Sequence, residues 1–254
     1  MEYDDLLNLV KKRRSIRRFK TDPIPDKQIE KIIDVARWAP SGFNMQPWEF
    51  HVIKKTELKE KIADLIGDIR PLTMSMEQTR EKWMGKPWRM TGLTEKNLDY
   101  TTAPVYILLL GDSRTNTGLP MYIRNDESTR KMIYYSSLAN AFLYMHLAAA
   151  SLDIGAQWVS ITHTGYIQSM IKQFIGIPSE LEIFDMIVLG YPEMIPRPKL
   201  MRNREEMIHY DDCGPDDYRG HDEVMEFVKR ARNWNIGSHS RVAGKNNKPE
   251  RTLK

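Results

Sequence analysis

Cysteine is nearly absent from the 254-residue sequence, which contains only Cys213. One cysteine excludes an intramolecular disulfide and any metal or iron–sulfur site made of cysteines alone. Long apolar runs are also missing, since no window reaches the roughly 18 uninterrupted apolar residues of a membrane-spanning helix. The opening residues MEYDDLLNLV lack the basic-then-apolar order of a secretory signal. We therefore expect no membrane association and a cytoplasmic location.

Several common catalytic motifs are missing as well. The sequence contains no GxGxxG fingerprint, no GxxxxGK[ST] phosphate loop, no HExxH and no GxSxG. Its six histidines are scattered, and only His209 and His221 approach the spacing of metal ligands. We expect neither a hydrolase nor a metal site.

The excess of positive charge is small and local. The chain has 38 basic and 34 acidic residues, a formal net charge of +4, and much of the excess lies in 11–20 and 229–254. A nucleic-acid-binding protein usually spreads basic side chains along one face, often with aromatic residues between them. Nucleic-acid binding is therefore only a distant alternative.

The spacing of apolar residues predicts two opening helices and then an alternation of strands and helices. The predicted helices span 3–13, 26–38, 57–66, 128–150, 166–174 and 222–233, and the predicted strands span 48–54, 104–111, 154–161 and 184–190. Asp26 is the expected N-cap of the second helix. This order indicates a mixed α/β or α+β protein.

Two segments do not fit this pattern. Residues 70–102 have weak periodicity, and loops of that length are usually functional lids or disordered inserts. From Cys213 onward the composition becomes polar, and the final residues GKNNKPERTLK have little apolar surface to bury. We expect one domain over 1–212 with a lid at 70–102, followed by a partly helical extension over 213–254 with a mobile tail.

The segment KKRRSIRRF, residues 11–19, has two possible roles. Cations at the C-terminal end of a helix complement its dipole, so the run could be a solvated helix end. Arg13, Arg14, Ser15 and Arg17 also supply forked donors and a hydroxyl within five residues, which suits a phosphate and a planar ring rich in carbonyls.

The segment APSGFNMQPW, residues 39–48, separates a predicted helix from a predicted strand. Ser41 and Gly42 would let the backbone approach a ligand closely, and Asn44 and Gln46 carry amides that can bind a ring edge. The same residue types are common in ordinary connections. Neither segment is decisive alone.

Taken together, these segments resemble the nitroreductase family of FMN-dependent enzymes. The run R-R-S-x-R is followed about 25 residues later by A-P-S-x-x-N-x-Q-P-W. IGAQWVSI (154–161), LGYPE (189–193) and the basic stretch ending in EEMIH (197–209) follow in the family's order. The resemblance implies an α+β fold, a three-layer α-β-α sandwich with a mixed central sheet and helices on both faces.

The resemblance also implies residue roles. Arg13, Arg14 and Ser15 would bind the FMN phosphate and ribityl chain, and Arg17 would lie near N1 and O2 of the isoalloxazine ring. A fixed cation there would stabilise the anionic reduced flavin. The strand end would contact the ring through Trp158, Val159, Ser160 and Ile161. The backbone N–H of Ser160 would meet flavin N5, so Ser160 and Arg17 are the candidate catalytic residues.

The loop is implied to reach the flavin that is bound mainly by the other subunit, which puts FMN at a homodimer interface. The implied loop residues are Pro40, Ser41, Gly42, Asn44 and Gln46. The last basic residue of the phosphate clamp is predicted to be Arg202, with Lys199 and Arg204 as alternatives.

The implied activity is a ping-pong reaction in which NADH or NADPH reduces FMN and flavin N5 passes the hydride to a small aromatic or conjugated acceptor. The acceptor would be a nitroaromatic, quinone, enone or halogenated aromatic. Alternatively, flavin itself is the substrate, as in the family branch that makes the lower ligand of cobalamin.

The predicted lid bears on the choice of acceptor. Its Trp83 and Trp88 suit a flat apolar substrate, and Arg80 or Arg89 could bind a carboxylate, although the same residues could simply pack the insert onto the core. The lid has no tyrosine between Glu81 and Lys96, unlike the deiodinase branch, which argues against deiodination.

Overall fold

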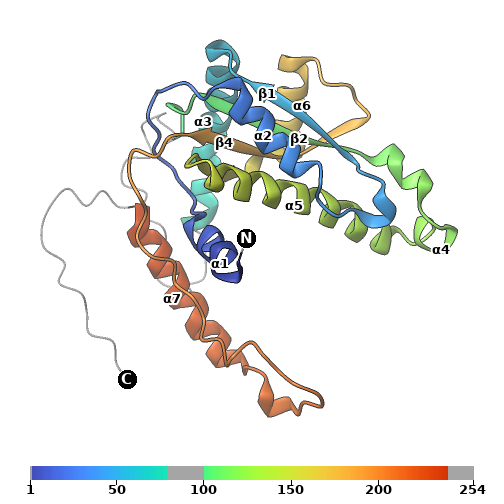
Figure 1. Cartoon of the computed structure of the whole chain (residues 1–254), viewed down its shortest axis with the longest axis vertical. Helices are drawn as coiled ribbons and strands as arrows, with labels where there is room; N and C mark the ends of the chain where they lie inside the picture. The colour runs from blue at the N-terminus through green and yellow to red at the C-terminus, as the bar shows by residue number, and fades with distance from the viewer. Residues whose placement is uncertain (1, 79–99, 240–254) are drawn as a thin grey trace, which may run out of the picture. The chain divides into compact units, whose positions relative to one another are not determined.

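The computed structural model describes residues 2–78 and 100–239, and Figure 1 draws the helices and strands that they form. In chain order these are α1 (Tyr3–Lys12), α2 (Asp26–Ala36), η1 (Gly42–Asn44), β1 (Trp48–Ile53), α3 (Thr56–Gln78), β2 (Val105–Asp112), η3 (Ser113–Gly118), α4 (Met121–Arg124), α5 (Glu127–Ser151), β3 (Gly155–Val159), η4 (Ser160–His163), α6 (Gly165–Ile175), β4 (Leu181–Gly190), η5 (Pro215–Asp217) and α7 (His221–His239).

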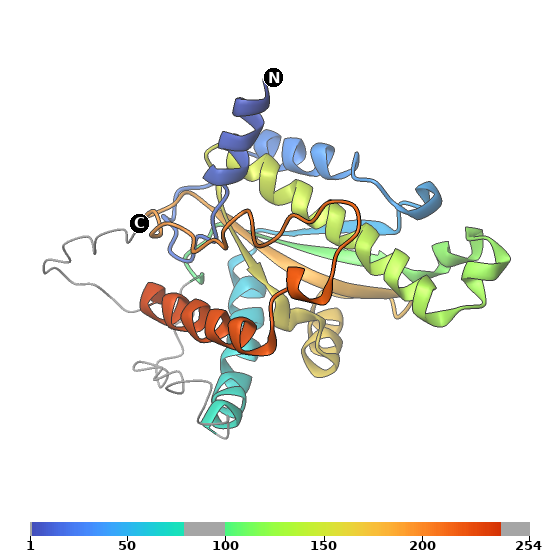
Figure 2. The same ribbon diagram turned by 90° about the horizontal axis from the view of Figure 1, so that it is seen from below.

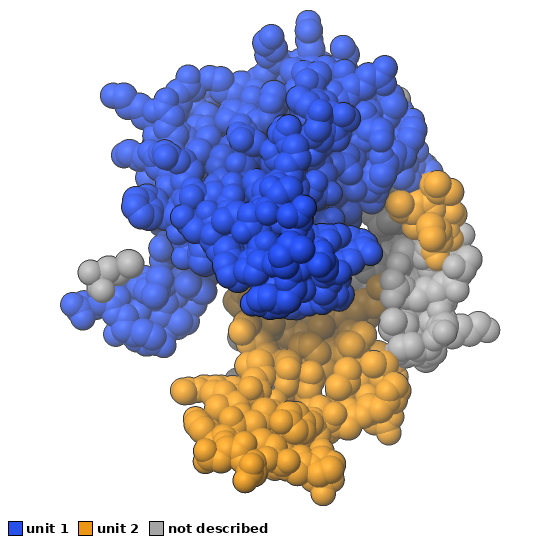
Figure 3. Space-filling model, turned by 90° about the vertical axis from the view of Figure 1, so that its right-hand side faces the viewer, with its two compact units in different colours: residues 1–71, 92–196 blue, residues 72–91, 197–254 orange. Residues whose placement is uncertain are grey.

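The chain divides into two compact units, coloured in Figure 3. Unit 1 contains residues 1–71 and 92–196, and unit 2 contains residues 72–91 and 197–254. All four strands belong to unit 1. The segment 213–254, expected to form an extension, falls within unit 2.

The strands form one sheet in the order β1-β2-β4-β3. All three strand pairings are antiparallel, and a parallel bridge adds Ser15 beside Ala156 of β3. The side chains of β2 alternate between the two faces of the sheet, as the twofold period of a strand requires. Because both faces are covered, β2 is buried from Val105 to Gly111 and reads as a continuous apolar run.

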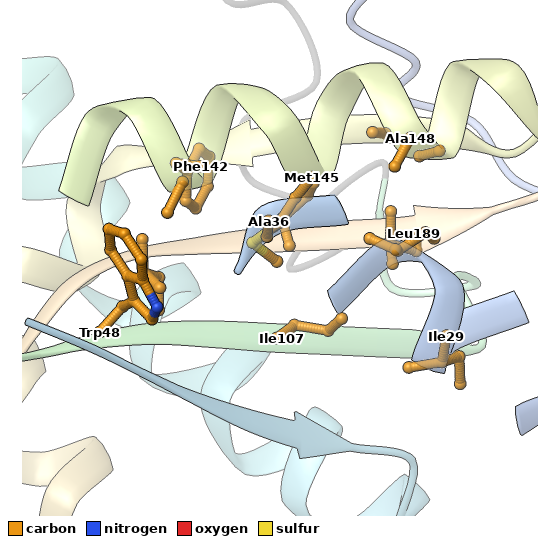
Figure 4. Packing of buried hydrophobic residues seen from close by; sticks show 14 of the residues in the cluster. Ile29, Ala36, Trp48, Ile107, Phe142, Met145, Ala148 and Leu189 are labelled. Atoms are coloured by element: carbon orange, nitrogen blue, oxygen red, sulfur yellow. The ribbon is translucent and has the colours of Figure 1, made fainter. Parts of the chain in front are cut away.

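Helices cover both faces of the sheet (Figure 2), as expected for an α-β-α sandwich. On one face, α2 and α5 pack on Val105, Ile107 and Leu109, and Figure 4 shows Phe142, Met145 and Ala148 of α5 in this layer. On the other face, α3 and α6 pack on Tyr106, Leu108 and Leu110. The long helix α5 thus lies over the middle of the sheet, where it can support side chains from several strands.

Three local predictions were wrong. Asp26 is the first residue of α2 rather than its N-cap, which is Pro25. The third helix continues past Ile66 to Gln78, through Pro71, and so enters the segment expected to be a lid. The strand expected over 154–161 ends at Val159, because Ser160–His163 form a 3₁₀ turn.

No helix in the described part of the chain is both long enough and apolar enough to cross a membrane.

Candidate functional site

The basic segment Arg13–Arg17 is bound to the edge of the sheet through its backbone. Ile16 donates its N–H to the Ala156 carbonyl at 3.0 Å, and the Ile16 side chain is buried. A Cβ at Gly155 would lie only 2.9 Å from Ile16, so the glycine permits this close approach. The backbone of the segment is therefore fixed beside β3, while Arg13, Arg14 and Arg17 remain partly exposed.

The basic side chains in this segment have different surroundings. Lys12 forms an exposed ion pair with Asp153 at 2.8 Å. Within the described residues, Arg13 forms no ion pair. Burial, and next the proximity of Arg14, lower the pKa of Arg13. A bound anion with two negative charges would relieve the repulsion between these guanidinium groups, so the donors fit a phosphate group.

The loop Pro40–Gln46 is attached to α5 through side chains. Ser137 accepts the N–H of Gly42 at 3.1 Å, and Asn140 donates its amide to the Pro40 carbonyl at 3.1 Å. Ser41 stabilises the end of the loop by accepting the N–H of Gln46 at 3.1 Å. The side chains of Asn44 and Gln46 are exposed, as required of groups that would bind a ligand.

The backbone of this loop is left-handed at three residues that are not glycine. The φ angles are 53° at Phe43, 56° at Asn44 and 46° at Gln46. Asparagine tolerates this conformation, but it is unfavourable for a bulky residue such as phenylalanine. Strain of this kind often accompanies functional sites. The contacts with α5 hold the loop in this conformation.

The loop and the basic segment lie toward opposite ends of α5 (Figures 1 and 2). The loop contacts Ser137, whereas Lys12 pairs with Asp153, just beyond the end of the helix at Ser151. Ser137 and Ser151 are about 20 Å apart at 1.5 Å of rise per residue. One subunit therefore presents the two predicted binding segments at separate places.

The end of β3 contains the remaining predicted site residues of unit 1. Val159 is buried, Trp158 and Ser160 are exposed, and Ile161 is partly buried. Ser160 begins the turn η4 directly after the strand. Because Ser15 bridges to Ala156 of the same strand, the structure brings the basic segment and the strand end onto one edge of the sheet.

Sequence reasoning missed a buried polar cluster beside this strand end. Asp185 of β4 accepts a hydrogen bond from Nε1 of Trp158, and its other carboxylate oxygen lies 3.0 Å from Nδ1 of His163. Burial raises the pKa of Asp185, and the bonds from His163 and Trp158 partly offset this rise. One signal was available, since Asp185 is the only charged residue in the apolar run IFDMIVLG.

His146 of α5 was also missed. It is buried beside Phe142 and Trp158, and no described residue forms a hydrogen bond with either ring nitrogen. Burial, and to a lesser extent the charge of Arg13, lower the pKa of His146 to about 3. Its imidazole is therefore neutral at physiological pH.

The sequence matches the Nitroreductase family over residues 10–191, well over half of the chain. The chain belongs to the nitroreductase family. The matched region includes the basic segment, the loop, the strand end and Asp185. It ends before unit 2 resumes at residue 197.

Relatives within the nitroreductase family are similar to this chain along most of its length. Iodotyrosine deiodinase 1 from Rattus norvegicus is 28% identical over 193 residues, which cover 76% of this chain and 64% of the rat protein. The chain thus spans slightly less than two thirds of that relative.

Two solved structures have a similar fold. A BluB-like flavoprotein from Clostridium difficile 630 is 28% identical, with a TM-score of 0.63 over 84% of this chain and all of the other. An oxidised iodotyrosine deiodinase bound to FMN and 3-iodo-L-tyrosine is 25% identical, with a TM-score of 0.62 over 82% of this chain and all of the other.

The residues predicted for the phosphate clamp and the lid of this nitroreductase-family chain do not belong to the described part of unit 1. Arg202 belongs to unit 2, where its guanidinium donates to the Glu206 carbonyl at 2.7 Å. Lys199 and Arg204 are exposed in the same unit. The choice among these three stays a prediction. The predicted lid residues Arg80, Trp83, Trp88 and Arg89 lie outside the described residues.

Proposed function

We propose that this nitroreductase-family chain binds FMN and uses NADH or NADPH to reduce a small aromatic or conjugated acceptor. Nitroaromatics, quinones, enones and halogenated aromatics are the candidate acceptors. The observation that carries the proposal is the basic segment, whose backbone is held beside β3 and whose partly buried Arg13, next to Arg14, has no carboxylate partner among the described residues. An FMN-bound relative of similar fold supports the choice of cofactor.

Bound FMN would supply reversible hydride transfer, and the protein residues would bind and orient the cofactor. Arg13 and Arg14 hold the phosphate through charge-assisted hydrogen bonds, and Ser15 donates to the ribityl chain. Arg17 places a cation at the pyrimidine side of the ring, where it stabilises negative charge. The strand end, with Ser160 at its tip, supports the ring through backbone contacts.

We further propose that two copies of the chain form the complete site. The loop Pro40–Gln46 of one subunit would cover FMN bound at the basic segment of its partner. The separation of these segments along α5 supports this arrangement, because one subunit does not bring them together. Exposed apolar side chains on α1 and α5, such as Val10 and Leu143, provide surface for the second copy.

The first test is the colour of the purified protein. We expect a yellow protein with flavin absorbance that bleaches when NADH or NADPH is added under argon. Colourless protein that cannot be reconstituted with FMN would contradict the proposal. Sedimentation of the FMN-bound protein tests the dimer, and a monomer that binds FMN fully would remove the two-subunit site.

Steady-state rates then identify the acceptor. The panel contains a nitroaromatic, a quinone, an enone and a halogenated tyrosine, the last because relatives are named iodotyrosine deiodinases. Incubation with reduced FMN and oxygen, followed by a search for a benzimidazole product, tests the alternative in which flavin is consumed. Release of such a product without turnover of any acceptor would favour that alternative.

A further inference from the structure

Asp185 lies beside the predicted flavin site, yet the proposed function gives it no role. Its side chain is 6% exposed, and it binds Trp158 and His163. These two partners precede and follow Ser160 in the sequence, at the end of β3 and at the end of η4. One buried carboxylate therefore links both sides of residues 158–163, which we call the Ser160 turn.

Stability alone does not explain a carboxylate at this position. Burial raises the pKa of Asp185, so the charged form is less favourable here than in water. Its strand neighbours Met186 and Ile187 are fully buried apolar residues. Well-packed apolar side chains are often as stabilising as a buried charged pair. The carboxylate is better explained by the geometry that it imposes.

That geometry concerns Trp158 most directly. The indole ring packs against Phe142 of α5 with centroids 4.4 Å apart and stacks on His146 at 6.0 Å. Its N–H is bound by Asp185, and yet 43% of Trp158 is exposed. An aromatic surface is thus held rigidly at the molecular surface next to Ser160. Rigid groups lose little conformational freedom when a ligand binds.

The other half of the Ser160 turn is fixed in a similar way. His163 is held through Nδ1 by Asp185, and Gln168 of α6 donates to the His163 carbonyl at 3.4 Å. Buried Thr162 donates its hydroxyl to the Val159 carbonyl at 3.1 Å. The backbone at Ser160 therefore lies between two points that Asp185 connects.

We propose that Asp185 is a positioning residue, which holds Trp158 and the Ser160 backbone in the arrangement that binds the flavin ring. The inference rests on the proposed function, because it assigns the Ser160 turn to flavin. It differs from that function in being testable on the protein without FMN, through the rigidity of the turn.

The experiment compares Asp185→Asn with wild type in three measurements on the full-length protein. Hydrogen exchange of peptides that cover 158–163 reports the turn, FMN titration reports affinity, and the midpoint potential of bound FMN reports the ring environment. Asparagine keeps the shape but offers only one acceptor for two donors. We expect exchange in the turn to become about tenfold faster and FMN to bind about tenfold more weakly, with a shifted potential.

Two further variants complete the test. Glu182→Gln makes the same chemical change on the same strand, where the carboxylate accepts from Tyr135 instead, and should leave all three measurements unchanged. His163→Ala removes one donor at a half-exposed position, so it should fold even if Asp185→Asn does not. We expect it to change the three measurements in the same direction by a smaller factor.

The outcomes separate the inference from the proposed function. If wild type binds FMN and both cluster variants match it in exchange, affinity and potential, the positioning role is wrong. Uniformly faster exchange across the sheet, with a lower urea midpoint and an unchanged potential, would also overturn it by showing a purely structural residue. If wild type binds no FMN, the proposed function and the flavin role of Asp185 both fail, and turn exchange still decides whether Asp185 holds the turn.

Discussion

The basic segment Arg13–Arg17 and the loop Pro40–Gln46 are held in the fold by different kinds of contact. The basic segment is held through its backbone, by the hydrogen bond from Ile16 to Ala156 of β3, which does not involve the arginine side chains. The loop uses Ser41, Ser137 and Asn140, and it contains left-handed residues. Substitutions in the basic segment should therefore change its chemistry, whereas substitutions in the loop should change its shape.

The largest effect is expected for the dependence of the free energy of unfolding on pH, and it comes from His146 of α5, near the basic segment. The pKa of His146 is lowered to about 3, whereas an unfolded histidine titrates near 6.5. Between about pH 6.5 and 3, His146 therefore binds a proton in the unfolded chain but not in the folded chain. The free energy of unfolding should fall by about 3 kcal/mol between pH 6.5 and 4 because of this residue alone.

Urea unfolding of His146→Leu at the two pH values measures this contribution. When the pH is lowered from 6.5 to 4, we expect the free energy of unfolding to fall by about 3 kcal/mol less in the variant than in wild type. Asp185 acts in the opposite direction, because its raised pKa favours the folded state as pH falls, and it is present in both proteins. His221→Asn, at an exposed position, is the control. Equal losses in wild type and His146→Leu would contradict the assignment.

The second effect concerns charge in the basic segment. Arg13→Ala should weaken FMN binding by about 2 to 3 kcal/mol, because it removes charge-assisted hydrogen bonds to the phosphate. The neighbouring Lys12→Ala should cost less than about 0.5 kcal/mol, because Lys12 already pairs with exposed Asp153. FMN titration by fluorescence measures both. Equal weakening would mean that the run acts only through its net charge.

The third effect concerns the shape of the loop. A Cβ at Gly42 would lie 2.2 Å from Cγ2 of Ile133, which projects from α5. Gly42→Ala should therefore lower the free energy of unfolding by about 1 to 3 kcal/mol. Gly165→Ala is the control, because a Cβ there meets no atom within 4 Å.

The clash predicts a rescue. Ile133→Ala removes the opposing methyl group, so the double variant should be less destabilised than the sum of the single variants. Additive losses in a double-mutant cycle would show that Gly42 matters for another reason.

Much of the fold was predictable because its signals are local. The helices and strands of unit 1 follow apolar periodicity, and α6 ends at Ile175, one residue beyond the predicted end, where Gly176 has a φ of 82°. The extension of α3 to Gln78 was not predictable from the same signals, because the weak periodicity of residues 70–102 suggested a loop, and the helix continues through Pro71. A proline inside a helix is an exception that only tertiary packing permits.

The site was predictable only where a segment has its own composition. The arginines and the loop form recognisable runs, but the bonds of Gly42 to Ser137 and of Trp158 to Asp185 join residues far apart in sequence. The left-handed conformation of Phe43 had no sequence signal either, because glycine is the usual residue there. Long-range contacts decide these features.

The smallest change in the free energy of unfolding is expected from substitution of Phe43 in the loop. This residue has a φ of 53° and is 51% exposed, so its conformation is unfavourable and its side chain buries little in one subunit. Phe43→Gly should therefore raise the free energy of unfolding by up to about 1 kcal/mol. If the loop covers FMN in the partner subunit, the same variant should bind FMN more weakly, since the glycine loop is less rigid.

Phe43→Leu keeps the strain and removes only the ring, so it should show no gain in stability. A Phe43→Gly protein that is both less stable and unchanged in FMN binding would mean that the side chain packs within its own subunit, and that the strained loop has no part in the binding site.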